Sequence, residues 1–411
     1  MMPVQQNRLP ILASCAKGVP PYLAAEIRSL GYPVLAERQS GVETEGTFAD
    51  AMRMNLHLRT AQRVMVEVSL FRARNADDLY AQVRNLPWET WLAADGYVRV
   101  ASAVSTSSIR DPRFASLRAK DAIVDRIRVV CGRRPDSGPD RDRASVFVYW
   151  NDMECRVYLD TSGESLSRRG YRKAGGEAPM QESLAAALIM ATGWDGTAPL
   201  VNPMCGSGTL AIEAALLALN RAPGMLRDNF AFMHIKGFDR GAWERLRQAV
   251  RGTVRTSLRC GKIVATDHDP RAVENARRNA KAAGVDSHIE FQVCDFAETR
   301  IPSGAGIVIL NPEYGVRLGE QSALEVTYKR IGDFFKQRCQ GYTGYMFTGN
   351  MELAKKQGLR TFRKLPFFNG EIECRLLGYQ LYAGSVRAKY ARKAQNLAAT
   401  DTDATTGAAS P

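Results

Sequence analysis

Four short apolar segments in the second half of the chain end in residues that suit the binding of a nucleoside or chemistry on one. The first, at 200–203, leads into the loop G-S-G at 206–208 and then into an Ala/Leu-rich helical pattern. The next two segments end at Asp267 and Asp295, and the fourth runs into N-P-E-Y at 311–314. In a doubly wound sheet, ligands bind where the carboxyl ends of the parallel strands meet, so we expect these residues to line one site.

The loop at 206–208 predicts a cradle for a nucleotide or nucleoside. Gly206 and Gly208 permit backbone conformations and close approaches that a Cβ would hinder. The helix that follows offers unpaired N–H groups toward a ligand. Taken alone the signal is weak, because small-residue turns between strand and helix occur throughout α/β proteins and most bind nothing. The other strand ends must therefore identify the ligand.

The two aspartates predict a pocket for adenosine. An acid after the second strand can accept hydrogen bonds from two ribose hydroxyls, and an acid after the third can accept one from the adenine amine. Asp267 could instead cap the next helix, but Asp269 before Pro270 suits that role better. Asp295 alone would be an ordinary turn residue. A nicotinamide dinucleotide is disfavoured, because the loop has no third glycine and about sixty residues separate it from Asp267, where roughly 20 are expected.

The sequence N-P-E-Y favours chemistry on an exocyclic base amine. Asn311 offers a side-chain carbonyl, Pro312 has no N–H to donate, and Tyr314 supplies a face on which a base can stack. Such an amine is conjugated with its ring and weakly nucleophilic. Two acceptors on its N–H groups would hold its lone pair toward a methyl sulfonium. Catalysis would then be mainly positioning for in-line displacement, with Asn311, Pro312 and Tyr314 as catalytic residues and no nucleophilic cysteine.

The segments between these residues predict the sheet that holds them. Helical patterns at 180–190, 209–219, 270–283, 323–339 and 352–357 alternate with strand patterns at 200–203, 262–267, 289–294, 305–310, 343–347, 360–365 and 371–382. Asn369 and Gly370 suit a type I′ turn, so we expect the last two strands to form an antiparallel hairpin. The pattern predicts an α/β fold with a doubly wound, Rossmann-like sheet.

The first half of the chain predicts an α+β region with a basic surface. Strand patterns at 11–16, 41–48, 63–71, 97–103, 145–150 and 155–159 alternate with helical patterns at 21–30, 76–86 and 113–131. The last helix has an apolar side that includes Leu117 and Ile123, and its other side is basic. Positive charge continues through 165–179, which we interpret as a linker.

A basic helix face is most often simply solvated. The clustering of cations here nevertheless favours contact with nucleic-acid phosphates. The candidate RNA-binding residues are Arg113, Arg118, Lys120, Arg168, Arg169 and Arg172.

Composition limits the class of protein. A chain of 411 residues should form two or three domains. The net charge of +13 favours a polyanionic partner, although a merely basic soluble protein stays possible. Eight cysteines without a C-x-x-C pair and only four histidines predict no metal site. We find no leader peptide and no apolar run long enough to span a membrane, so we expect a soluble cytoplasmic protein.

Taken together, these motifs resemble the THUMP-domain class I S-adenosylmethionine-dependent RNA methyltransferases. The resemblance rests on N-P-M-C-G-S-G-T at 202–209, N-P-E-Y, G-E-A-P-M-Q-E-S-L-A-A-A-L upstream and N-G-E-I-E-C-R-L near the end. The segment A-S-L-R-A-K-D-A-I-V-D at 115–125 resembles the THUMP helix, and S-R-R-G-Y-R resembles the linker of the family. The similarity covers most of 11–382, and its nearest group forms N2-methylguanosine in large-subunit ribosomal RNA.

The resemblance implies the domains, the cofactor and the partner. A ferredoxin-like and THUMP RNA-binding region at 1–165 would be followed by a linker at 166–179, a class I methyltransferase domain at 180–390 and a disordered tail at 391–411. The cofactor would be S-adenosyl-L-methionine, and the partner would be 23S ribosomal RNA or a precursor of the large ribosomal subunit. The candidate cofactor-binding residues are Asn202, Pro203, Cys205, Gly206, Ser207, Gly208, Thr209, Asp267, Asp295 and Phe296.

Two departures from the family pattern leave alternatives open. The family usually has Asp in place of Asn202 and a second Pro in place of Glu313, so cofactor binding could be weaker and base choice altered. Methylation of adenine N6 in RNA or DNA, or of guanine N2 in tRNA, are alternatives within the same chemistry. A non-catalytic assembly factor with a decayed cofactor pocket is a third. With one methyltransferase module rather than two, we expect one methylation.

Overall fold

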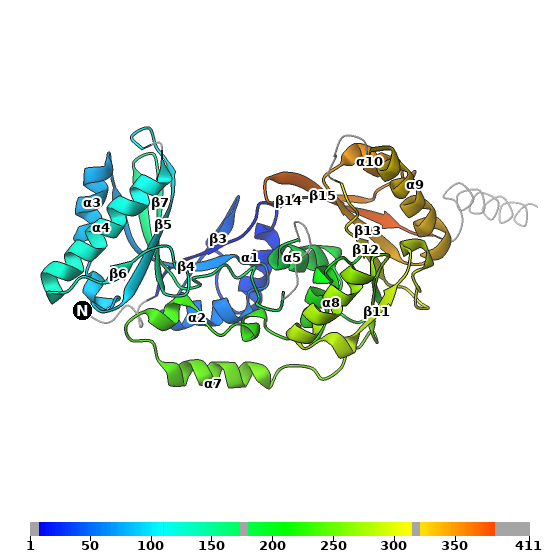
Figure 1. Ribbon diagram of the computed structural model, residues 1–411, viewed down its shortest axis with the longest axis horizontal. Coiled ribbons are helices and arrows are strands. Elements are labelled where there is room, and N and C mark those ends of the chain that lie inside the picture. The colour runs from blue at the N-terminus through cyan, green and yellow to red at the C-terminus, as the bar shows by residue number, and fades with distance from the viewer. Residues whose placement is uncertain (1–7, 110, 173–179, 315–320, 383–411) are drawn as a thin grey trace, which may run out of the picture.

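The computed structural model describes residues 8–109, 111–172, 180–314 and 321–382 and places two sheets side by side (Figure 1). The first sheet has eight strands in the order β2-β3-β1-β4-β8-β7-β5-β6. Its strands are β1 (Leu9–Ser14), β2 (Ala36–Arg38), β3 (Gly41–Gly46), β4 (Arg63–Arg72), β5 (Tyr97–Ser105), β6 (Asp136–Ser137), β7 (Ala144–Asn151) and β8 (Glu154–Asp160). The antiparallel pairing of β4 with both β1 and β8 makes the N-terminal region one continuous sheet.

Four α-helices and a short 3-10 turn pack on this sheet. They are α1 (Pro20–Ser29), α2 (Phe48–His57), α3 (Ala76–Arg84), α4 (Pro112–Cys131) and η1 (Trp88–Thr90). Figure 1 shows α3 and α4 side by side at β5 and β7, while α1 and α2 lie by the other half of the sheet.

Two features of the α-helices in this region differ from the sequence-based expectation. The patterns above do not predict helix α2, although Thr47 and Asp50 form a reciprocal capping box at its start. Leu117, expected on the apolar side of α4, is 52% exposed, because the buried stripe is formed by Ala115, Ala119 and Ile123 instead.

The second sheet has seven strands in the order β11-β10-β9-β12-β13-β15-β14. They are β9 (Leu200–Pro203), β10 (Ile263–Asp267), β11 (Ile289–Val293), β12 (Ile307–Leu310), β13 (Thr343–Thr348), β14 (Arg363–Asn369) and β15 (Ile372–Gln380). The first five in this order pair in parallel, and β15 runs antiparallel to both of its neighbours. The predicted doubly wound sheet with an antiparallel terminal hairpin is confirmed.

Helices cover both faces of the second sheet. They are α5 (Glu182–Thr192), α6 (Thr209–Ala218), α8 (Pro270–Ala283), α9 (Gln321–Arg338) and α10 (Met351–Lys355). Neighbouring residues of β9 belong to different apolar clusters: Leu200 packs with the cluster that includes α6, and Val201 with the one that includes α9. This alternation follows from the two-residue period of a strand.

An insertion between α6 and β10 stands apart from this pattern. It contains η2 (Pro223–Leu226), η3 (Ala231–His234) and α7 (Arg240–Arg251), none of which the sequence patterns predict. Further short 3-10 turns, η4 (Asp286–His288) and η5 (Phe296–Glu298), flank β11. Trp243 of α7 is buried edge-on against Phe230 and Phe232 of the same insertion, and the Phe232 N–H donates to the carbonyl of Thr161 in the N-terminal region.

The terminal hairpin turns differently from the expected type I′ turn. Asn369 is the last residue of β14 and pairs with Ile372, so the two loop residues are Gly370 and Glu371. Gly370 has φ +63°, whereas Glu371 does not have a positive φ. A two-residue loop with positive φ only at its first position is of the II′ class, which requires glycine there. The predicted hairpin is therefore right and its predicted turn type wrong.

The segment between the sheets is built into the interior, which corrects the prediction that Arg169 contacts RNA. Arg169 is 1% exposed, and its Nε lies 3.5 Å from Oε1 of the fully buried Glu213 in α6. Its two terminal nitrogens donate to the carbonyls of Leu166 and of Arg59 in the N-terminal region. Burial of this guanidinium between the two halves removes it from any RNA-facing surface.

Arg172 is turned inward in a similar way. It donates to the carbonyl of Met180 at 2.7 Å and to the Thr209 hydroxyl at 3.1 Å, and it lies 3.7 Å from Glu182. The charges of 165–172 therefore have partners that the linear sequence does not reveal. The remainder of the predicted linker, 173–179, and the predicted tail, 391–411, lie outside the described residues.

The buried ion pair predicts a stability effect. Replacing Glu213 by Ala leaves the Arg169 guanidinium buried without its carboxylate, which should lower the free energy of unfolding by about 3–5 kcal/mol. Urea unfolding of both variants measures it. The matched control is Glu274→Ala, which breaks the exposed pair of Glu274 with Arg278 on α8 and should cost no more than ~0.5 kcal/mol. Equal losses in the two variants would contradict the role assigned to Glu213.

Candidate active site

The predicted strand ends do meet at one edge of the second sheet. Strands β11, β10, β9 and β12 are consecutive neighbours and run parallel. Their carboxyl ends therefore bring together residues from four separate parts of the chain. This edge carries the glycine loop, Asp267, Asp295 and Asn311.

The two glycines of the loop do different things. A Cβ on Gly208, which has φ +82°, would lie 2.9 Å from the Cβ of Ala276 in α8, so this glycine is required for packing of α6 on α8. A Cβ on Gly206 would meet nothing within 4 Å, which leaves open space on that side of the loop. Of these two glycines, Gly206 is therefore the one whose backbone borders open space. The carbonyl of Ser207, between the two glycines, accepts a hydrogen bond from Nδ2 of the buried Asn279.

Asp267 fastens the glycine loop to the end of β10. Its Oδ2 accepts the Gly206 N–H at 2.9 Å, and its Oδ1 accepts the Asp269 N–H at 3.1 Å. The cap of α8 is Asp269, whose side chain accepts the Arg271 N–H, as the sequence predicted. A carboxylate has about four acceptor positions, so Asp267 has acceptor capacity beyond these two bonds, although the Nδ1 of His268 also lies 3.3 Å from its Oδ1.

Asp295 has a partner that the sequence did not reveal. Its Oδ1 accepts the Ala297 N–H at 2.9 Å and a hydrogen bond from Arg330 of α9 at 2.8 Å. The Arg330 guanidinium lies 4.9 Å from the centre of the Phe296 ring. Burial acts to raise the pKa of Asp295, but these two hydrogen bonds outweigh it and the pKa lies below its ordinary value. Asp295 is therefore an anion at neutral pH, and its Oδ1 already accepts hydrogen bonds from the Ala297 N–H and from Arg330.

Asn202 is fully buried at the end of β9 and ties this strand to β12. Its Nδ2 donates to the carbonyl of Ile309 at 2.9 Å, a bond that an ionised Asp could not make. Its Oδ1 is buried and has no partner among the described residues. The side chain thus combines a structural bond with a free acceptor.

The Oδ1 of Asn311 is a second buried acceptor without a described partner. Buried polar atoms are nearly always hydrogen-bonded, so two orphan acceptors on neighbouring strands suit a ligand that brings N–H groups. An amino-acid ammonium near Asn202 and a base amine near Asn311 would supply them. The set of free acceptors therefore fits an adenosyl amino acid together with a nucleobase.

The loop after Asn311 is held from two sides. The Tyr328 hydroxyl of α9 donates to the carbonyl of Glu313 at 3.2 Å. Nδ2 of Asn369 donates to the Tyr314 hydroxyl at 2.8 Å. Burial raises the pKa of Tyr314 to about 12, so its hydroxyl stays protonated at neutral pH. Pro312 is buried, whereas the Glu313 side chain is exposed.

Cys205 is buried just before the glycine loop, and burial together with the nearby Asp267 raises its pKa well above the ordinary value. A thiol held in its protonated form is not a nucleophile. This agrees with the expectation that no cysteine acts as a nucleophile.

Comparison with known proteins decides the family. Family models match residues 10–65 (RlmL ferredoxin-like domain), 73–160 (THUMP domain) and 169–377 (RMKL-like, methyltransferase domain). The chain belongs to the RMKL-like methyltransferase family. The last match begins at Arg169, the residue that anchors the linker in the methyltransferase domain.

Relatives of this RMKL-like chain fall into two length classes. It is 37% identical over 380 residues to the ribosomal RNA large subunit methyltransferase K/L of Syntrophotalea carbinolica, and 38% identical over 371 residues to that of Psychromonas ingrahamii. These matches cover 90% and 89% of the chain but only 53% and 49% of those proteins, so it spans about half their length. A Synechocystis protein that carries the name of an RNA methyltransferase is 35% identical, with 91% of this chain and 97% of that one covered.

Two solved structures share the whole architecture. SMU.472, which is named as a methyltransferase and was solved in complex with SAH, is 29% identical with a TM-score of 0.82; 93% of this chain and 100% of that one are covered. A Listeria monocytogenes protein named as an N6-adenine-specific DNA methylase is 30% identical with a TM-score of 0.82, and 91% of this chain and 97% of that one are covered.

The basic side of α4 in this RMKL-like chain is partly neutralised. Arg118 lies 2.7 Å from Asp77 and above the Tyr80 ring, and Lys120 lies 3.1 Å from Asp121. Arg113 is exposed at the start of α4. Arg168 is 72% exposed and only loosely paired with Glu164, at 3.5 Å. Of the six predicted RNA contacts, Arg113 and Arg168 are the most accessible.

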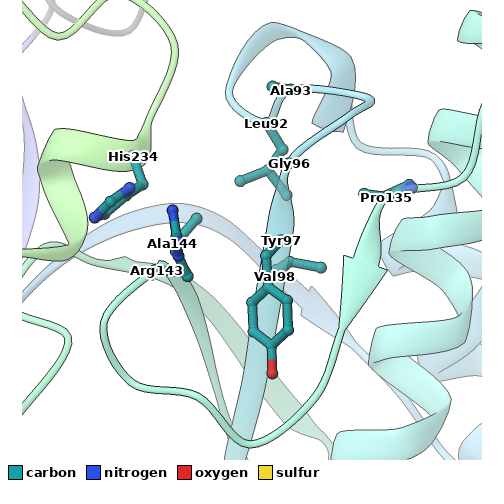
Figure 2. Close-up of a pocket in the computed structure, with 9 residues that line it drawn as sticks. All are labelled: Leu92, Ala93, Gly96, Tyr97, Val98, Pro135, Arg143, Ala144 and His234. Carbon is teal, nitrogen blue, oxygen red and sulfur yellow. The ribbon is translucent and has the colours of Figure 1, made fainter.

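A cavity of about 200 Å³ lies away from the strand ends. Figure 2 shows that Tyr97 and Val98 come from β5 and that His234 faces Arg143 across it. The Nε2 of His234 lies 2.8 Å from Oδ1 of Asn229. The other residues that line the cavity are Leu92, Ala93, Gly96, Pro135 and Ala144. None of the predicted site residues lines this cavity.

The double role of Asn202 can be tested with Asn202→Asp. The carboxylate cannot donate to Ile309, so the variant should lose about 1–3 kcal/mol of unfolding free energy. Burial raises the folded-state pKa of such an acid, so the loss should be small below pH ~4 and grow as the pH rises to 8. The predicted cofactor should recover part of it, because its ammonium would pair with the carboxylate.

Thermal melting at pH 4 to 8, with and without S-adenosylmethionine, measures these effects. The exposed Asn85→Asp change serves as control and should show no such pH dependence. An Asn202→Asp protein as stable as the parent at pH 8 would refute the importance of the Ile309 bond.

Proposed function

We propose that this chain is an S-adenosyl-L-methionine-dependent RNA methyltransferase that modifies the exocyclic N2 of a guanosine in large-subunit ribosomal RNA. The observation that supports it most is the orphan Oδ1 of Asn311, placed beside the glycine loop and followed by Pro312 and a fixed Tyr314. The names of the K/L relatives and the match to a THUMP domain support RNA as substrate.

The residues of the sheet edge would bind the cofactor through its polar groups. Asn202 Oδ1 would accept from the ammonium, and the remaining acceptor positions of Asp267 would bind the ribose hydroxyls. Asp295 would accept from the adenine amine beside Phe296. When bound, S-adenosylmethionine supplies an electrophilic methyl group on a sulfonium.

Asn311 and the backbone around Pro312 would orient the target base. The Asn311 carbonyl accepts from an N–H of the exocyclic amine, so that the nitrogen lone pair can be directed toward the methyl group of the cofactor. The positive charge that develops on the nitrogen as it gains the methyl carbon would be stabilised by the neutral Asn311 amide, which does not act as a base. The sulfur would keep the electron pair of the carbon–sulfur bond that breaks, and water would take the surplus proton. Tyr314 would stack on the base. The main contribution of the protein is thus positioning.

The departure at Asn202 does not require a decayed pocket. Its Nδ2 bond to Ile309 aligns β9 with β12, and its Oδ1 stays available as an acceptor. Replacing Asp by Asn removes a charge, so weaker ammonium binding is the expected cost. This favours an enzyme over a non-catalytic assembly factor.

Adenine N6 is the second candidate target. It is favoured by the name of the Listeria protein and by the chemistry of N-P-x-Y, which suits any exocyclic amine. Nucleoside mass analysis of ribosomal RNA from a deletion strain separates the two. Loss of one N2-methylguanosine would support the proposal. Loss of an N6-methyladenosine with an unchanged content of methylated guanosines would contradict it. The same digest of the tRNA fraction tests a tRNA target.

The location of the protein follows from the same proposal. A ribosomal RNA substrate places the enzyme in the cytoplasm. Among the described residues, no helix is sufficiently long and apolar to cross a bilayer. Within the same part of the chain, no three His, Cys, Asp or Glu side chains are grouped as metal ligands.

Asn311→Ala should remove the acceptor on the target amine. Methyl transfer should fall at least ~10²-fold, while the affinities for RNA and for S-adenosylmethionine stay unchanged. Single-turnover assays with tritiated cofactor give the rate, and filter binding and calorimetry give the affinities. Loss of RNA binding to the same degree as loss of activity would contradict the role of Asn311.

Arg113→Glu combined with Arg168→Glu should weaken RNA binding. Each lost phosphate contact should reduce the slope of log K against log salt by ~0.7–0.9. Filter binding between 50 and 200 mM salt, about the range over which such contacts dominate, measures it. The double Lys variant keeps both charges and should bind like the parent. An unchanged slope in the Glu variant would exclude these residues as contacts.

A further inference from the structure

The start of the N-terminal region is packed directly on β14 of the second sheet. The Tyr22 ring of α1 stacks on Phe367 with centres 5.6 Å apart and planes inclined by 16°. A Cβ added to Gly18 would lie 2.4 Å from the carbonyl oxygen of Pro366, so only glycine fits there. The segment 17–22, here called the β14 anchor, therefore contacts β14 through both backbone and ring.

Phe368 is also covered by the β14 anchor. The ammonium of Lys17 lies 5.6 Å from the centre of its ring. Three successive residues of β14 are thus in contact with the N-terminal region, and the fourth, Asn369, ends the strand. Contacts at consecutive positions fix the strand end against both translation and twist.

Asn369 passes this constraint to the candidate active site. Its Nδ2 donates to the Tyr314 hydroxyl at 2.8 Å. The hairpin of β14 and β15 therefore holds the hydroxyl end of the Tyr314 side chain. The hydroxyl lies at the far end of the side chain, so a small displacement of it would rotate the whole ring.

Two further sides of the Tyr314 ring are confined, by Phe347 and by Gly349. Phe347 meets it edge-to-face at 6.3 Å between centres, and a Cβ on Gly349 would lie 2.9 Å from its Cδ2. The ring cannot shift toward β13 without a clash. Its orientation is consequently set by the wall at Gly349 and by the bond to Asn369.

We infer that Asn369 is a positioning residue for Tyr314, and that the β14 anchor of the N-terminal region sets the orientation of Tyr314 through it. The catalytic consequence rests on the proposed function, whereas the coupling itself does not. The region that would hold RNA thereby fixes the tyrosine that would stack on the target base. A misplacement on the order of 1 Å at such a group can lower a rate by about 10²-fold.

A double-mutant cycle tests the role of Asn369. Tyr314→Phe keeps the ring and removes the hydroxyl, and Asn369→Ala removes the donor. Each single change should lower kcat about 10-fold to 100-fold and leave KM for RNA unchanged, because the ring is misplaced without loss of binding groups. If Asn369 acts through the hydroxyl, the double variant should be no slower than the slower single variant.

Multiplied losses in the double variant, or losses confined to KM, would overturn this role. The control is Asn75→Ala, which makes the same truncation at the cap of α3 and should leave kcat unchanged.

A measurement without methyl transfer tests the β14 anchor. In protein labelled with 3-fluorotyrosine, the Tyr314 resonance is assigned by its absence from the Tyr314→Phe variant. Tyr22→Ala removes the stack on Phe367 and should shift or broaden the Tyr314 resonance, and Asn369→Ala should do so as well. Tyr22→Phe keeps the stack and should leave that resonance in place.

A Tyr314 resonance that is unchanged in Tyr22→Ala would overturn the coupling. Because this readout needs no substrate, it separates failure of the coupling from failure of the proposed function. A protein that methylates no RNA but shows the resonance shift would refute only the latter.

Discussion

The buried Arg169 guanidinium is the interaction on which the arrangement of the two halves depends. It lies between Glu213 of the second sheet's α6 and the carbonyls of Leu166 and Arg59. A buried cation is tolerated only when a counterion and several acceptors surround it. Without any one of these partners the buried guanidinium would be incompletely compensated. Because the partners come from both halves, the observed conformation of 166–172 requires both halves to be folded and in contact.

A second arginine strengthens the same junction. Arg227, in the insertion after α6, donates to the carbonyls of Ser162, Glu164, Ser165 and Arg168. Burial lowers its pKa to about 10, which leaves it charged at neutral pH. One apolar cluster runs through this junction, from Ile11 in the first sheet to Leu376 in the second. The two halves therefore behave as one packed body rather than as domains on a flexible tether.

Because the two halves are packed together, the polar groups of the candidate active site are preorganised. The strand ends carry acceptors that are already in place, and the orphan oxygens of Asn202 and Asn311 are held by bonds made elsewhere in the same side chains or loop. Preorganised acceptors need little rearrangement when a ligand arrives. The N-terminal region is also connected to Tyr314 through β14, by the stack of Tyr22 on Phe367 and the hydrogen bond from Asn369.

The sequence by itself determined the order of the elements, the doubly wound sheet and the residues at four strand ends, because period-two and helical patterns and glycine or proline signals are local. It also identified Asp269 rather than Asp267 as the cap of α8. Only the tertiary structure decided which polar groups meet across long distances. The cationic segment at 166–172 suggested RNA contact, yet Arg169 is neutralised by Glu213, which lies 44 positions away and whose partnership no local pattern encodes. Arg330 beside Asp295 and Asn369 on Tyr314 were missed for the same reason: hydrogen-bond partners are chosen by the packing of elements, and a linear sequence does not specify that packing.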